Sequence, residues 1–170
     1  MSTNHVVQDG SIGIDLNVIG SARAYGLGET HKTDGGGEFI YVLFNSAVNQ
    51  GGLTEIKAGY LASAALGTQL VIDDARLGFA QTTYAASQYG FIALAGQNVL
   101  VRTLGGVGVR GQPLYTTDTA GALSTATVSA SQFQVWGVWL HSSVSATAAT
   151  ATVSTASVSY PMLRRPRAVG

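Results

Sequence analysis

The sequence predicts an all-β protein, a small β-barrel or β-sandwich domain with an extended N-terminal arm. Valine, isoleucine and threonine together occupy 41 of the 170 positions, whereas glutamate and lysine together occupy five. β-Branched side chains fit the pleated surface of a sheet, while Glu and Lys fill the exposed faces of ordinary helices. The 22 glycines favour tight turns between short strands. This length suits one domain with its own core.

We divide the chain into an arm with a Gly-rich loop at 1–37, a barrel or sandwich domain at 38–160, and a basic tail at 161–170. Within the arm, apolar residues alternate with polar residues or glycine, at Ile12, Ile14, Leu16 and Val18. A period of two indicates a strand with one buried face. If this strand pairs with a neighbouring subunit, protomers would exchange strands. The arm ends in the loop formed by Gly35, Gly36 and Gly37.

The domain is expected to consist of short apolar strands bounded by turn residues, at 38–44, 66–72, 76–82, 89–95, 98–104 and 133–141. Residues 54–57 form either a short strand or a helical turn, and 83–88 form a connector with weak helical content. Gly96-Gln97 separates two strands and therefore predicts a hairpin. Residues 142–159 contain only Ser, Thr, Ala and Val, which favours a strand with a bulge at Ala148-Ala149.

Charge is scarce and balanced. Charged residues make up 11% of the chain and the formal net charge is zero, against roughly 25% charged residues in a typical soluble domain. Either the chain is a compact β-domain with a Ser/Thr surface, or it shares much of its surface with other subunits of a large assembly. Zero net charge provides no general attraction for nucleic acid or an anionic membrane.

The absence of cysteine excludes disulfides, thiolate chemistry and Cys-ligated metal sites. The N-terminus lacks the basic region and apolar run of a secretory signal. No stretch approaches the ~18 consecutive apolar residues of a spanning helix. We therefore expect a protein that is made in a cytosol and is not inserted into a membrane.

Three local patterns could indicate a ligand site, and we interpret each as structural. Gly106–Gly111 matches G-x-G-x-x-G, but no helix that could hold a pyrophosphate follows it, so we predict a turn and no cofactor. His31, Asp34 and Glu38 match no defined metal spacing, and we expect them to be solvated. The segment 73–76, Asp-Asp-Ala-Arg, is expected to form a local ion pair. No catalytic residue or metal site is predicted.

Two aromatic residues and three arginines are candidate contact residues. Trp136 and Trp139 are three positions apart on a predicted strand, so they should point to opposite faces. One should lie in the core, and the other should pack on a partner or bind a ligand such as a sugar ring. Arg164, Arg165 and Arg167 are too few for specific DNA binding. They either contact a protein or are solvated.

Several glycine-based segments together resemble the decoration, or cement, proteins of tailed-phage capsids. They are GGEFIYV at 36–42, GFA at 78–80, YGFIALAG at 89–96, GQPLYT at 111–116, AGAL at 120–123 and VWGV at 135–138. The resemblance implies a β-barrel-like domain without catalytic residues. It also implies a homotrimer that binds the outer capsid surface and bridges neighbouring subunits of the major capsid protein.

We therefore expect a structural virion protein that stabilises the shell and is assembled in the bacterial host cytoplasm. Its expected contact regions are the arm, the glycine loop, the tail and the tryptophans. Three alternatives remain. A carbohydrate-binding head fibre or tail adhesin would use an exposed tryptophan, and a tail-tube-type subunit would form rings or tubes by itself. An enzyme would use the glycine motif as a cofactor site.

Overall fold

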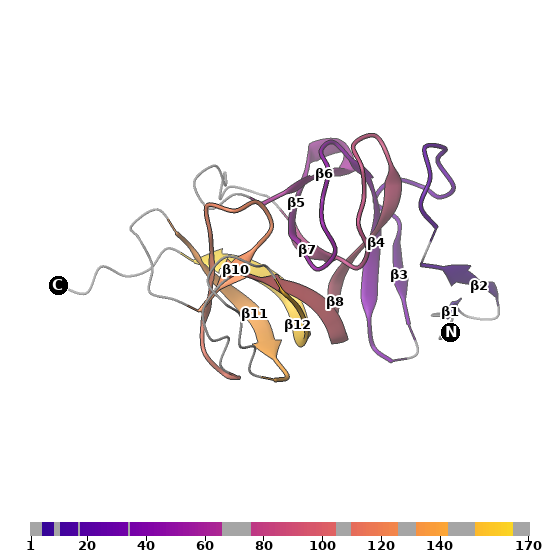
Figure 1. Ribbon diagram of the computed structural model, residues 1–170. Coiled ribbons are helices and arrows are strands. Elements are labelled where there is room, and N and C mark those ends of the chain that lie inside the picture. The colour runs from indigo at the N-terminus through magenta and orange to yellow at the C-terminus, as the bar shows by residue number, and fades with distance from the viewer. Residues whose placement is uncertain are drawn as a thin grey trace.

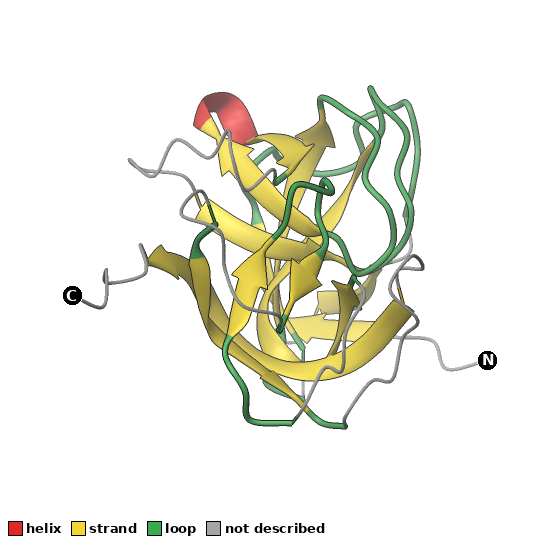
Figure 2. Ribbon diagram, turned by 60° about the vertical axis from the view of Figure 1, so that its left-hand side comes forward, coloured by secondary structure: helices red, strands yellow, loops and turns green. Residues whose placement is uncertain are grey.

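The computed structural model describes residues 5–8, 11–16, 18–33, 35–65, 76–104, 110–125, 132–142 and 152–164. The fold is all-β, as predicted, and one 3₁₀ turn is the only helical element in these ranges (Figures 1 and 2). The elements are β1 (His5–Gln8), β2 (Ser11–Asp15), β3 (Thr30–Lys32), β4 (Glu38–Phe44), β5 (Leu53–Lys57), η1 (Ala58–Tyr60), β6 (Leu61–Ala64), β7 (Arg76–Ala80), β8 (Tyr89–Thr103), β9 (Leu114–Thr116), β10 (Leu123–Ser124), β11 (Gln134–Leu140) and β12 (Thr152–Arg164).

Five strands close into a barrel. The pairing runs from β4 through β8, β7, β5 and β6 and returns to β4, where β4 and β6 are parallel. Every second residue of β4 points inward, so Ile40, Val42 and Phe44 are fully buried. Phe44 stacks on Tyr84 with ring centroids 3.9 Å apart. A closed sheet has no free edge, and this barrel therefore forms a self-contained core.

A second group of strands is built on the far half of β8. It runs through β12, β11, β9 and β10, and Leu123 of β10 pairs with Thr103 to return to β8. Its core contains mainly small and branched residues, including Val99, Val101 and Val135. Figure 1 shows β8 passing between the two groups. The two halves of the molecule therefore share one strand.

The predicted hairpin at Gly96-Gln97 is wrong. β8 continues as one strand of 15 residues, from Tyr89 to Thr103. Gly96 has φ 145° and Asn98 has φ 59°, so the backbone bulges where a turn was expected. A Cβ on Gly96 would lie 3.1 Å from Cα of Gly37. Glycine thus permits a close approach of two strands at the point where β8 leaves the first barrel.

The N-terminal region divides into two parts. β1 and β2 form a separate two-stranded sheet, in which Val6 pairs with Ile14. The following residues fold back, because Leu16 is buried beside Tyr41 and Phe91 on the outside of the barrel. β3 then pairs with β4. The boundary predicted at residue 37 therefore lies within the β3–β4 hairpin.

Most of the other strand predictions match the structure. Residues 53–57 form a strand rather than a helical turn, and 76–82 and 133–141 contain β7 and β11. The segment 83–88 contains a turn and no helix. β12 extends to Arg164, so the first residues of the predicted basic tail continue a strand. The predicted strand at 66–72 and the bulge at Ala148-Ala149 lie outside the described residues.

Candidate functional site

Trp136 and Trp139 lie on the same face of the sheet, and the prediction that one of them is in the core is wrong. Their exposed fractions are 45% and 54%. The register of β11 on β12 shifts between Trp136 and Val138, because Trp136 pairs with Met162 whereas Val138 pairs with Val158. Such a bulge resets the alternation of side chains along a strand. Two tryptophans three positions apart therefore both face outward.

The bulge depends on Gly137. This residue has φ 79°, in the left-handed region that is costly for residues with a Cβ. An added Cβ would lie 2.3 Å from the carbonyl oxygen of Ser159. A glycine inside a strand often marks a bulge. The glycine between the two tryptophans is therefore the sequence feature that indicates the bulge, and the bulge was not predicted from it.

We define the tryptophan face as the outer surface of β11 and β12 formed by Trp136, Trp139, Val153 and Met162. Met162 is 66% exposed and Val153 is 44% exposed. Trp139 pairs with Ser157, whose hydroxyl lies 2.8 Å from Nε2 of His141. The face thus combines large apolar side chains with small polar ones and contains no carboxylate. Grouped exposed apolar side chains of this kind mark sites of interaction.

The other predicted contact residues are dispersed. Ile12 and Ile14 belong to β2, and Val18 is half-buried. Leu16 is 8% exposed, so its side chain packs within the molecule and does not face a partner. In the β3–β4 turn, Gly35 and Gly36 are exposed and Gly37 is buried. Arg164 ends β12 and pairs with Gln134, while Arg165 and Arg167 lie outside the described residues.

His31 is fully buried, contrary to the expectation of a solvated side chain. Its ring lies 5.9 Å from that of Tyr25 and 5.5 Å from that of Phe91. Its Nε2 lies 3.2 Å from Oε1 of Glu29. The folded-back N-terminal segment thus covers an imidazole that the local sequence placed in a loop.

Glu38, the second described residue of the group His31, Asp34 and Glu38, makes contacts within the protein, and Asp34 lies outside the described residues. Within the described ranges, no three histidine, aspartate or glutamate side chains are grouped to hold a metal ion. Glu38 accepts a hydrogen bond of 2.6 Å from the Tyr160 hydroxyl. This bond raises the pKa of Tyr160, because it favours the protonated phenol. Glu38 therefore connects β4 to β12.

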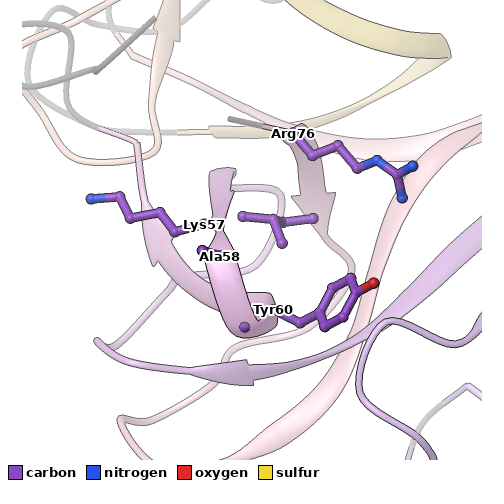
Figure 3. Close-up of a pocket in the computed structure, with 6 residues that line it drawn as sticks. Lys57, Ala58, Tyr60 and Arg76 are labelled. Carbon is purple, nitrogen blue, oxygen red and sulfur yellow. The ribbon is translucent and has the colours of Figure 1, made fainter. Parts of the chain in front are cut away.

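A pocket of about 380 Å³ lies at the end of β5, and sequence analysis did not predict it. Its walls are Ile56, Lys57, Ala58, Gly59, Tyr60 and Arg76. Arg76 reaches the pocket because it pairs with Ile56 across β5 and β7. Figure 3 shows Arg76 and Tyr60 extending to one side of the pocket and Lys57 to the other. Of the G-x-G-x-x-G motif, the structure describes only Arg110 and Gly111, and neither lines the pocket.

No protein-family model matches the chain, and a search of curated proteins finds no significant match. Among the residues described, no helix is long and apolar enough to cross a membrane.

Proposed function

We propose that this chain is a decoration protein of a tailed-phage capsid. It binds the outer surface of the major capsid protein as a homotrimer and stabilises the shell by bridging neighbouring subunits. It acts by binding and catalyses no reaction. The observation that supports this proposal most strongly is the tryptophan face, which presents two indoles and a methionine to solvent on a chain with little charge.

The physical reason is the energetics of protein interfaces. Tryptophan is enriched among the few residues that dominate binding energy. A fully buried indole covers on the order of 200 Å², but about half of each indole is already covered in the free protein. At about 25 cal/mol per Å², burying the exposed halves of both provides roughly 5 kcal/mol of gross apolar gain. The loss of translational and rotational freedom on association offsets a large part of that gain. A repeating shell then adds many such contacts through multivalency.

The β1–β2 hairpin is the second proposed contact. It forms a sheet of its own, separate from the two larger groups of strands, and strand edges can pair with a neighbouring chain. In the proposed assembly, Ile12 and Ile14 contact a capsid subunit or a second copy of this chain. Arg164, at the end of β12, and the residues Arg165 and Arg167 are proposed as separate charged contacts. If a variant that lacks residues 1–15 binds capsids as tightly as the wild type, the hairpin is not a capsid contact.

Replacing both Trp136 and Trp139 with alanine is expected to weaken binding to matching empty capsids by about 10- to 100-fold. Neither side chain belongs to the buried core, so the variant should still fold, which its melting curve and circular dichroism spectrum would show. The measurement is co-sedimentation of purified protein with capsids over a range of concentrations. Leu61→Ala is the matched control, because Leu61 is 37% exposed but lies on β6, outside the proposed contact regions. Equal binding by wild type and the double variant would contradict the proposal.

The carbohydrate-binding alternative uses the same surface and is favoured by one observation. Two indoles on one face, beside the His141–Ser157 pair, could stack on sugar rings and donate hydrogen bonds to them. A glycan array separates the two functions. Specific glycan binding that is lost with Trp136→Ala or Trp139→Ala, without capsid binding, would establish an adhesin. Spontaneous rings or tubes would instead indicate a tail-tube-type subunit.

A further inference from the structure

The pocket beside η1 contains a strained aromatic residue. Gly59 has φ 73° and Tyr60 has φ 59°, so two consecutive residues occupy the left-handed region. A bulky side chain in that region costs on the order of 1–2 kcal/mol. Glycine or asparagine would close the same turn at lower cost. A tyrosine at this strained position points to a role for its side chain.

The ring of Tyr60 is held in place and yet remains accessible. A Cβ on Gly28 would lie only 2.1 Å from Cζ of Tyr60, so the ring rests directly on the backbone of the N-terminal segment. Gly28 itself donates a 2.8 Å hydrogen bond to the carbonyl of Tyr41. Tyr60 is nevertheless 42% exposed. Tyr60 therefore lines the pocket with a ring that is fixed by packing and still partly open to solvent.

The charges around the pocket leave one cation without a carboxylate partner. Lys57 Nζ lies 3.2 Å from Oε2 of the buried Glu55. Glu38 accepts a hydrogen bond from Tyr160 and lies 3.8 Å from Lys32. Within the described part of the chain, Arg76 makes no ion pair, and no aspartate or glutamate lines the pocket. The site thus complements a single negative charge.

We propose that this pocket binds the carboxylate of an aspartate or glutamate side chain on a partner protein. The Arg76 guanidinium presents two parallel N–H groups to the two carboxylate oxygens, and the Tyr60 hydroxyl donates a further hydrogen bond. Ile56 and Ala58 pack against the methylene groups of the incoming side chain. That the partner is the capsid protein rests on the proposed function, whereas carboxylate binding itself does not.

The test is an NMR titration of the full-length ¹⁵N-labelled protein with N-acetyl-glutamate N-methylamide. The backbone amides of 57–60 and 76–78 should shift and saturate, with a Kd of about 1–10 mM. The corresponding glutamine compound, at equal ionic strength, should produce no saturating shift. Arg76→Gln should weaken binding at least tenfold, and Arg76→Lys should give an intermediate value. Lys32→Gln, which removes a lysine paired elsewhere, should leave binding unchanged.

Three results would overturn the inference: equal binding of the glutamine compound, unchanged binding by Arg76→Gln, or equally tight binding of inorganic phosphate, which would indicate a general anion site. Because the probe is measured on the isolated protein, the outcome is independent of capsids. If the protein binds the probe but not capsids, the carboxylate-binding proposal stands and the decoration function is wrong. If it binds capsids but not the probe, the decoration function stands and the carboxylate-binding proposal is wrong.

Discussion

Replacing Gly137 with alanine is expected to lower the free energy of unfolding by about 3 kcal/mol. Two costs add. The backbone at φ 79° is strained for alanine by about 1–2 kcal/mol. The new Cβ would also lie 2.3 Å from the Ser159 carbonyl oxygen, which belongs to the paired strand β12 and cannot move without disrupting the β11–β12 register. Urea unfolding monitored by tryptophan fluorescence measures the change.

Gly36→Ala is the matched control for this prediction. Gly36 has φ 77°, almost the same as Gly137, but an added Cβ would meet no atom within 4 Å. It should therefore cost only the backbone strain, about 1 kcal/mol. If Gly137→Ala costs no more than Gly36→Ala, the close contact with Ser159 is not what maintains the bulge. The tryptophan face would then need another explanation.

Raising the pH above 10 is expected to destabilise the protein through Tyr84. Burial raises the pKa of its hydroxyl above the ordinary value of 10.0, because the phenolate cannot be solvated in the barrel. The hydroxyl donates a 3.0 Å hydrogen bond to the Phe91 carbonyl, which a phenolate cannot do. The raised pKa in the folded state means that the stabilisation is complete below pH 10. It is lost at about 1.4 kcal/mol per pH unit above it.

The measurement is urea unfolding of wild type and Tyr84→Phe at pH 8.0 and at about pH 11.5. At pH 8 the variant should be less stable by about 1 kcal/mol, since it lacks one hydrogen bond. Across the alkaline range the wild type should lose roughly 2 kcal/mol more than the variant. Tyr60→Phe removes an exposed hydroxyl and should follow the wild type. Parallel loss by wild type and Tyr84→Phe would contradict a role for Tyr84.

The fold class could be predicted from local patterns, because composition and periodicity are properties of single segments. β4, β7 and β11 each appeared as apolar runs bounded by turn residues. The bulges could not be predicted in the same way. Gly96 resembled a hairpin turn, but β8 pairs with β4 along its first half and with β12 along its second. These distant partners hold the strand continuous, and no local signal reports them.

The candidate sites show the same limit. Trp136 and Trp139 could be singled out from the sequence, but their shared face depends on the register of β11 against β12. Met162 joins them only through that pairing. Similarly, Arg76 and Tyr60 line the same pocket because β7 pairs with β5. The burial of His31 depends on Tyr25 and Phe91, which come from two other segments. Pairing between strands that are distant in the sequence therefore determines which of these side chains lie together, and local patterns do not show that pairing.

The most direct test of the decoration function is the mass of the purified protein by light scattering, followed by its co-sedimentation with matching empty capsids. We expect a trimer of about 52 kDa, three times the chain mass of 17.5 kDa, as closed homo-oligomeric symmetry allows. This trimer should bind capsids at a fixed stoichiometry. A monomer, or a species that forms rings by itself, that does not sediment with capsids would rule out the decoration function.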